Sequence, residues 1–466
     1  MDSHPESLLP GATRALAEFA AGVQFDAIPA EVIARMKTSF LDSVGCCLFG
    51  ATLPWTQHVQ AMIEEEGARP VASIFGTGRR TSVAGAVLVN ATAGHAFELD
   101  DIHKESILHA GSIATPVVVN LGEMTGRASG RTLLTAMTTG YEIGTRVGNA
   151  ATMGLFFRGF HPQGASGVFV AAAAAGRMLN LDTDHMQHAL GIVGSQAGGL
   201  MAAQEGAMVK RFHSGRAAQS GVYAAFLAQR DFTGISDVLE AGYGGYLSSY
   251  SNKPNAARLT DGLGTVWETG KVGYKPHACV TSIHSALDAF GHILREQHLS
   301  PDDVARVDIG VSAMTYTHCA WEYKAQGVTA AQMNLFYGIA VTAFDGMAFV
   351  AQYAESRLAD PRILDFITRI DARIDPEIEA MGPAYRHAAR VSVMTRDGRT
   401  YAHEILNRRG SPENPLSHED VVYKFRNVVE SCLSRSDIDR VIALSDRLDT
   451  LEDTTELRAL LAAPRS

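Results

Sequence analysis

The sequence predicts a mainly α fold in which a large all-helical domain is joined to a smaller α+β domain. Two observations carry this prediction. Apolar residues recur at helical spacing through residues 1–265, and alternating, strand-like runs begin only after that point. The chain has 466 residues, of which 46% are hydrophobic and 19% charged, which excludes a disordered or collagen-like protein and allows a large core.

The helical domain begins with residues 8–49. Its segment from Pro29 to Gly50 spaces apolar side chains three or four residues apart, and these two residues punctuate its ends. Residues 167–176, GVFVAAAAAG, are about half the ~20 residues that a bilayer span needs and are interpreted as a buried helix. Apolar stretches rich in Ala and Gly, typical of closely packed helices, cover 83–97, 113–126, 131–153, 165–180, 184–204 and 216–230.

The α+β domain is predicted over residues 266–405. Three segments alternate in strand fashion, and Asp397-Gly398 between the last two predicts a hairpin. Ser417 then begins a capping box that opens a helix. The helical tail to residue 466 packs on the first domain or extends the second. The expected strands cover 304–312, 390–394 and 399–405, and the helical runs 280–296 and 328–357.

Charge and cysteine usage limit the partners and the compartment. Forty basic and 50 acidic residues give a formal net charge of −10, which disfavours nucleic acid and acidic membranes as partners. An anionic substrate would therefore need a local concentration of positive charge. The five cysteines, at 46, 47, 279, 319 and 432, form no disulfide framework, and the N-terminus has no secretory h-region, so we expect a cytoplasmic protein.

Common cofactor motifs are missing from the sequence. We find no G-x-G-x-x-G after a strand, no G-x-x-x-x-G-K-[ST] and no H-E-x-x-H, so neither a nucleotide cofactor nor a catalytic zinc is predicted. His185 and His188 lie three residues apart but have no third ligand nearby. We therefore predict no metal and no cofactor.

Clusters of His, Lys and acidic residues are the remaining candidates for chemistry. Each cluster taken alone is equally compatible with a structural role, as a solvated loop or a basic surface. The irregular segment 97–112 contains a carboxylate–imidazole set, the window 209–221 is strongly basic, and Tyr337 lies in an apolar helix, where a hydroxyl needs a partner. The candidates are Asp100, Asp101, His103, His109, His161, Lys210, Arg211, His213, Arg216, Lys275, His277, His284 and Tyr337.

Together these residue types indicate proton transfer next to a carboxylate. They include carboxylates, imidazoles, ammonium groups and a phenol, but no nucleophile motif. Such groups suit abstraction or delivery of a proton at a carbon α to a carboxylate, with cations binding the negative charge that develops. The competing interpretation is a helical binding or scaffold protein, which would carry these clusters scattered over its surface.

The chain resembles the MmgE/PrpD family, which includes 2-methylcitrate dehydratases, cis-aconitate decarboxylases and iminodisuccinate epimerase. The strings that carry the resemblance run in family order over nearly the whole chain. They are LDSVGCCLFGA, ELDDIHKESILHAG, GFHPQGASGVFVAAAAAGRML, ALGIVGSQAGGL, VKRFHSGRAAQSGVYAAFLAQRDFTG and KPHACVTSIHSALDA.

The resemblance implies a helical domain made of 1–265 together with 406–466, an α+β lid over 266–405, and an active site between them. It further implies a homodimer, no cofactor and a small anionic polycarboxylate as substrate. Carried over to this sequence, it places catalytic roles at His109, His161, Lys210, Asp101 and Tyr337, with Asp101 orienting a histidine. Substrate binding falls to Asp100, His103, Arg211, His213, Lys275, His277 and His284.

The acidic loop bears on which reaction to expect. In the family that the chain resembles, dehydratases have a loop of the type D-Y-N-D-T-W followed by G-H-P, and decarboxylases have a Trp–His–Pro run. This chain has ELDDIHKESILHAG, with no Trp and with Ala110 where Pro is usual. These departures favour the branch containing the epimerase, so epimerisation of an iminodisuccinate-type substrate is the main prediction. The alternatives are 2-methylcitrate dehydration and cis-aconitate decarboxylation.

Overall fold

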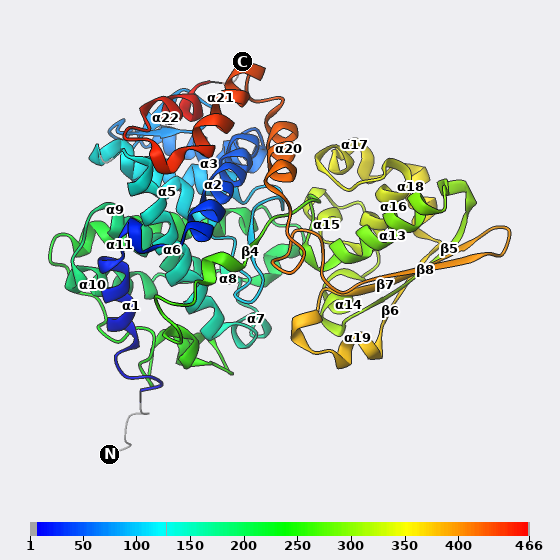
Figure 1. Cartoon of the computed structure of the whole chain (residues 1–466), viewed down its shortest axis with the longest axis horizontal. Coiled ribbons are helices and arrows are strands. Elements are labelled where there is room, and N and C mark those ends of the chain that lie inside the picture. The colour runs from blue at the N-terminus through cyan, green and yellow to red at the C-terminus, as the bar shows by residue number, and fades with distance from the viewer. Residues whose placement is uncertain (1–6, 127, 465–466) are drawn as a thin grey trace.

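The computed structural model describes residues 7–126 and 128–464 and confirms the mainly α fold class with a smaller α+β part (Figure 1). The helical part begins with α1 (Ala12–Gly22), α2 (Ala30–Gly50), α3 (Pro54–Glu65), α4 (Val83–Gly94), α5 (Gly111–Thr125) and α6 (Gly130–Ala151). It continues with α7 (Gly154–Phe157), α8 (Pro162–Ala165), α9 (Gly167–Met178), α10 (Thr183–Gly194), α11 (Val209–Ala228) and α12 (Tyr246–Tyr250).

Small residues let the central helices of this part approach one another closely. Helix α11 packs against α4 and α9, and α6 packs against α9. A Cβ atom at Gly215 would lie 2.1 Å from Oγ1 of Thr92, and one at Gly221 would lie 2.3 Å from Cβ of Ala171. Any larger residue at either position would push α11 outward, together with the basic residues of its first turn. Helix α9 is buried along nearly its full length, as predicted for 167–176.

The α+β part, which we call the lid, is built on a four-stranded sheet in the order β6-β5-β7-β8. Strands β5 and β6 are parallel, whereas β5 pairs with β7 and β7 with β8 in antiparallel register. The strands are β5 (Val304–Val311), β6 (Ile370–Ile374), β7 (Ala389–Thr395) and β8 (Thr400–Ile405). The helices are α13 (His284–Glu296), α14 (Ala313–Cys319), α15 (Val328–Gln332), α16 (Leu335–Asp345), α17 (Glu355–Leu358), α18 (Pro361–Ile367) and α19 (Pro376–Ala380).

The chain enters and leaves the lid through adjacent segments. The short strand β3 (Ile102–His103) pairs with β4 (Val272–Gly273), which anchors the acidic loop to the beginning of the lid. Just beyond β4, the amide of Tyr274 donates to the carbonyl of Gly410, 2.9 Å away, on the returning segment. Residues that follow β4 and β8 therefore lie at the junction of the two parts.

The C-terminal helices pack on the helical part. They are α20 (His418–Val429), α21 (Arg435–Asp446) and α22 (Thr455–Ala462), and α20 and α21 both contact α2 (Figure 1). The buried Lys424 of α20 lies 2.7 Å from Oδ1 of Asp42 and also donates to the carbonyl of Leu99 in the acidic loop. The predicted capping box is confirmed, because Ser417 and Asp420 each accept the other's backbone N–H.

Several elements differ from the sequence prediction. The helical run 328–357 is broken, because Asn334 caps a new helix by accepting from the amide of Tyr337, and Gly346 ends that helix at φ +71°. The run 184–204 likewise stops at Gly194. The predicted hairpin is confirmed, with Gly398 at φ +87°. The sequence analysis missed β6 and the small hairpin of β1 (Ala72–Ile74) and β2 (Arg79–Thr81).

Two further predictions concern the thiols and the membrane. All five cysteines are buried. Within residues 7–126 and 128–464, no helix combines the length and the hydropathy that crossing a bilayer requires.

Candidate active site

A pocket at the junction of the helical part and the lid is lined by four of the predicted residues, His109, His161, Lys210 and Lys275. The acidic loop between α4 and α5 supplies one wall, α11 and the segment before α8 supply a second, and the lid supplies the rest. Its polar lining consists of Glu98, Lys104, His109, His161, Gln204, Lys210, Lys275, Thr281, Ser282, His318, Arg386, His387 and Arg408.

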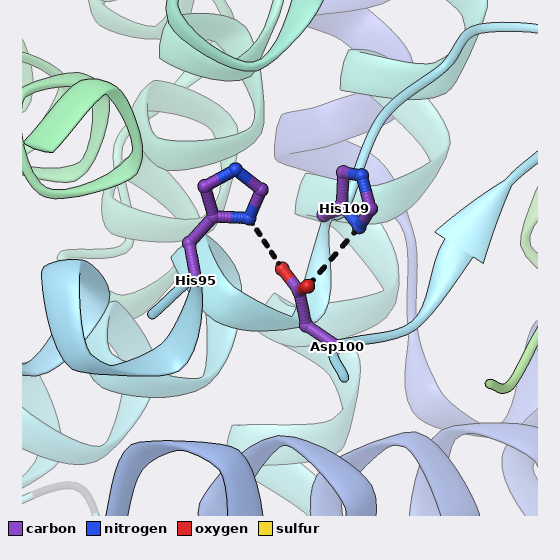
Figure 2. Close-up of side chains that lie close together, drawn as sticks. All are labelled: His95, Asp100 and His109. Carbon is purple, nitrogen blue, oxygen red and sulfur yellow. Dashed lines mark hydrogen bonds and ion pairs between the residues drawn. The ribbon is translucent and has the colours of Figure 1, made fainter. Parts of the chain in front are cut away.

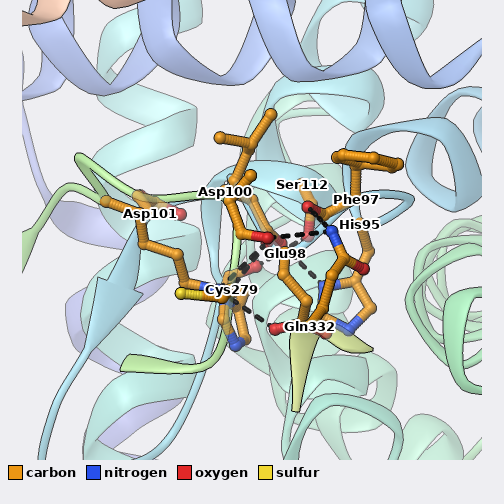
Figure 3. A network of polar contacts seen from close by, with 12 residues as sticks. His95, Phe97, Glu98, Asp100, Asp101, Ser112, Cys279 and Gln332 are labelled. Atoms are coloured by element: carbon orange, nitrogen blue, oxygen red, sulfur yellow. Dashed lines mark hydrogen bonds and ion pairs between the residues drawn. The ribbon is translucent and has the colours of Figure 1, made fainter. Parts of the chain in front are cut away.

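Glu98 is the centre of a buried ion network in this pocket (Figure 3). Oε1 accepts from the ammonium of Lys210 and from the guanidinium of Arg211, and Oε2 lies 3.2 Å from Nζ of Lys275. Burial raises the pKa of the Glu98 carboxyl, but the three cations together hold it well below its usual range. The backbone of Glu98 has φ +55°, a strained conformation that its side-chain contacts stabilise.

The network also connects the two parts of the molecule. Nη2 of Arg211 donates to Oε1 of Gln332 in α15 of the lid at 3.1 Å. Nε2 of Gln332 in turn donates to the carbonyls of Phe97 at 2.8 Å and Ala278 at 2.9 Å. One buried side-chain amide therefore joins the acidic loop, α11 and the lid (Figure 3).

Positive charge dominates the pocket. Five lysine or arginine residues line it, namely Lys104, Lys210, Lys275, Arg386 and Arg408, against the single carboxylate of Glu98. Burial lowers the pKa of Lys210 to about 8 despite its pairing with Glu98. Burial also lowers the pKa of Arg386 and of Arg408 to about 10. Because the chain as a whole is acidic, an anionic substrate needs a local concentration of positive charge, and these cations supply it.

Asp100 lies between two histidines (Figure 2). Nδ1 of His95 is 2.7 Å from Oδ2, and Nδ1 of His109 is 3.3 Å from Oδ1. Burial raises the pKa of Asp100, but the two imidazoles hold it well below its ordinary value, so the side chain is a carboxylate. His109 lines the pocket, and because its Nδ1 faces Asp100, Nε2 is the nitrogen left to face a substrate.

The same three residues are the only group of metal-binding type among the described residues, with ligand atoms within 4.8 Å of one another. Their surroundings fit hydrogen bonding better than a cation. The 2.7 Å separation between His95 and Asp100 is that of a hydrogen bond, and the ammonium of Lys275 already lies 3.9 Å from Oδ1 of Asp100. A metal ion there would be repelled by this buried ammonium.

His161 contributes a second imidazole to the pocket. Its Nδ1 lies 2.8 Å from Nδ1 of His213 in α11, so one of the two nitrogens donates to the other. Burial, together with His95 and Lys210, lowers the pKa of His161 well below its ordinary value, which keeps the ring neutral. Gln163, two residues later, accepts from the amide of His109 and donates to its carbonyl, both at 3.0 Å, which fixes the backbone of the acidic loop.

Asp101 points away from the histidines. Its Oδ2 accepts from the hydroxyl of Tyr141 at 2.6 Å, and its Oδ1 accepts from the amide of Gly111 at 3.0 Å. Burial raises its pKa to about 8 against the effect of these bonds. In the structure the carboxylate beside a histidine is therefore Asp100, and Asp101 holds the beginning of α5. The order of the two acids along the chain could not reveal which one turns inward.

Other predicted residues lie outside both the pocket lining and the networks described above, because they bond partners elsewhere. His103, in β3, bonds Ser106 and Glu268. His277 lies 2.9 Å from Asp288, and His284 bonds the carbonyl of Cys279. The hydroxyl of Tyr337 donates to the carbonyl of Gln352 inside the lid.

Several residues in or next to the pocket are not among the candidates predicted from the sequence. His95, which directly follows α4, and Gln163 lie close to recognised clusters, so a wider window would have included them. The lid residues had no such signal, because they come from the end of α14 and from the segments flanking β7 and β8. They are His318, Arg386, His387 and Arg408.

Comparison with known proteins covers both parts of the chain. Residues 14–258 match the MmgE/PrpD N-terminal domain, and residues 277–450 match the MmgE/PrpD C-terminal domain. A cis-aconitate decarboxylase of Aspergillus terreus is 31% identical over 489 aligned positions, covering 99% of this chain and 98% of that protein. The human cis-aconitate decarboxylase is 27% identical, with 98% and 96% covered. The cis-aconitate decarboxylase-like protein oryM of Aspergillus oryzae is 29% identical, with 99% and 98% covered.

Proposed function

The chain belongs to the MmgE/PrpD family, and on that premise we propose that it is a carboxy-lyase that decarboxylates a small tricarboxylate of the cis-aconitate type without a cofactor. The observation that carries the proposal is the charge of the junction pocket, which is lined by five cationic side chains and one carboxylate. Glu98 has one negative charge against the three positive charges of Lys210, Arg211 and Lys275, so an excess of positive charge remains to bind a polyanion.

The comparisons favour decarboxylation over the other reactions of the family. The relatives that span nearly the whole chain are named as decarboxylases or decarboxylase-like proteins, and none is named as an epimerase. Epimerisation of an iminodisuccinate-type substrate, the main prediction from the acidic loop, is therefore not supported. The absence of a Trp–His–Pro run from the acidic loop therefore has less weight in this proposal than the names of the relatives. A scaffold protein is disfavoured as well, because the clusters converge on one pocket.

The reaction requires one proton and no redox partner. In cis-aconitate, the carbon–carbon bond to the carboxylate on the methylene group breaks and CO₂ leaves. The electron pair forms a new double bond at that carbon, and the former double bond takes a proton at its far end. A six-carbon tricarboxylate thus becomes a five-carbon dicarboxylate, with one proton taken from the enzyme.

We assign delivery of this proton to His109. Its Nδ1 faces the Asp100 carboxylate, which stabilises the protonated ring, and its other nitrogen faces the pocket. His161 is neutral and serves as a hydrogen-bonding partner of the substrate. Lys210, Lys275 and Arg408 bind the carboxylates that remain.

The test is proton NMR in D₂O with purified enzyme and, in separate samples, cis-aconitate, 2-methylcitrate and iminodisuccinate. We expect cis-aconitate alone to lose CO₂ and to give a product with one deuterium on its new saturated carbon. A product of water loss from 2-methylcitrate, or deuterium exchange in iminodisuccinate without a change of skeleton, would replace decarboxylation with the corresponding alternative. No reaction of cis-aconitate under any of these conditions would overturn the proposal.

A further inference from the structure

We infer that His95 is a positioning residue for the chemistry at His109, acting through the carboxylate of Asp100. The inference rests on the proposed function for its kinetic consequence, but the geometry stands independently. His95 is fully buried, its Nδ1 lies 2.7 Å from Asp100, and its ring centroid is 4.9 Å from that of His109. Its side chain does not line the pocket, so it has no direct access to a substrate.

The hydrogen-bond pattern fixes the protonation of His95. Asp100 is ionised and can only accept, so Nδ1 of His95 carries the hydrogen. Burial lowers the pKa of His95 to about 4, so the ring stays neutral and Nε2 carries a lone pair. That nitrogen is buried and has no hydrogen-bond partner among the described residues. His95 is therefore a neutral donor and not a second cation beside Asp100.

A neutral donor at this position has two consequences for Asp100. It holds one carboxylate oxygen in place, which leaves the other oxygen aimed at Nδ1 of His109. Its hydrogen bond also draws part of the negative charge of Asp100 toward His95. Because His95 is neutral, it adds no positive charge beside Asp100, and the carboxylate can still stabilise a protonated His109. In metal sites, comparable indirect partners orient the metal-binding histidines, and their loss typically reduces metal affinity or activity about 10- to 100-fold.

Other charged or titratable groups also lie close to His95, Asp100 and His109. Lys275 lies 3.9 Å from Asp100, the ring of His161 is 5.8 Å from that of His95, and Glu98 with Lys210 is adjacent. The test must therefore change the hydrogen bond from His95 while leaving these groups unchanged. An asparagine amide nitrogen occupies nearly the position of an imidazole Nδ1, whereas leucine fills a similar space without a donor.

The experiment compares His95→Asn with His95→Leu. We expect His95→Leu to lower kcat for the proposed substrate about 10- to 100-fold with a smaller change in KM, and His95→Asn to recover most of kcat. In ¹H–¹⁵N spectra of the imidazole groups, the titration of His109 should move to higher pH in His95→Leu and return in His95→Asn. The upward shift is expected because a carboxylate without its second donor attracts the imidazolium proton more strongly.

Controls separate this inference from the proposed function and from misfolding. The NMR titration of His109 requires no turnover, so it remains decisive if cis-aconitate is not the substrate. His188→Asn, at a histidine of α10 that bonds Gly234, should leave both readouts unchanged. The inference would be overturned if both variants fold, lose kcat equally and show no movement of the His109 titration. A stoichiometric metal ion in the purified protein that both variants lose would overturn it as well.

Discussion

The helical side and the lid side of the junction have similar residue types but use them differently. On the helical side, titratable groups contact one another, as Glu98 does with Lys210 and as Asp100 does with His109. On the lid side, His284 and Tyr337 are bonded to backbone carbonyls of the lid itself. A side chain whose polar atoms are already satisfied locally stabilises the fold, whereas one paired within a charged network beside a pocket remains available for chemistry.

Cavity volume does not indicate which cavity is the candidate site. A groove of about 430 Å³ between α13, β8 and α20 is much larger than the junction pocket, at about 70 Å³. Charges along the groove are largely neutralised by neighbours, as in the pairs His277–Asp288 and Arg409–Asp420. The lining of the small pocket carries an excess of positive charge, with five cations and one carboxylate, so charge and not volume identifies the candidate site.

The largest effect is expected from removing a cation on the helical side. Lys210→Met keeps the length of the side chain but removes the charge, and it should lower kcat/KM for cis-aconitate at least about 100-fold, because transition-state charge loses its partner. The measurement is steady-state kinetics on the folded variant. Lys324→Met, at an exposed lid lysine, is the matched control and should retain full activity. Unchanged turnover in Lys210→Met would remove the core of the site assignment.

A second effect concerns the pH dependence of stability. Asp101 has a pKa of about 8 in the folded protein, whereas the unfolded chain releases this proton near pH 4. Its contribution to the free energy of unfolding is therefore complete below pH 4 and is lost as the pH rises to about 8. Relative to Asp101→Asn, the wild type should lose up to about 1.4 kcal/mol per pH unit within that window.

Urea unfolding at pH 5, 6 and 7 measures this slope. Asp303, an exposed lid residue, provides a contrast of opposite sign, because hydrogen bonds from Ser300 lower its pKa. Its contribution is present above its unfolded pKa and is lost only as the pH falls below that value. Parallel stability curves for wild type and Asp101→Asn between pH 5 and 7 would show that Asp101 is ionised in the folded protein.

The smallest effect is expected on the lid side. Tyr337→Phe removes only the hydroxyl that donates to the carbonyl of Gln352, 2.7 Å away, so kcat/KM should change less than about twofold while stability falls by about 1 kcal/mol. Steady-state kinetics and thermal unfolding provide the two readouts. A large loss of turnover in a stable Tyr337→Phe variant would contradict the distinction between the two sides and would return Tyr337 to the catalytic set.

Much of the fold was predictable because it depends on local patterns. Helical spacing predicted α2, α4 and α9, and Asp397-Gly398 predicted the β7–β8 hairpin, since these signals act within a few residues. Strand β6 escaped prediction because it is defined by pairing with β5, more than 60 residues earlier in the chain, and most of its side chains are exposed. The break at Asn334 depends on one cap, which an apolar pattern does not reveal.

The candidate site was predictable in residue type but not in partnership. The basic window at Lys210 and the acidic loop are visible in the sequence, and both reach the pocket. Which of Asp100 and Asp101 faces the histidines depends on how the loop turns at Glu98. The lid cations Arg386 and Arg408 have no local signal, because they approach Lys210 only when the lid packs on the helical part.

By itself the sequence determined the mainly α fold and the family and predicted proton transfer as the chemistry, since these depend on residue types and on spacing along the chain. Only the tertiary structure decided that His95 stands behind Asp100, that Tyr337 is occupied within the lid, and that five cations share one pocket. The physical reason is that a pKa, a hydrogen bond or an ion pair is a property of partners in space. Those partners come from segments that the chain brings together only on folding.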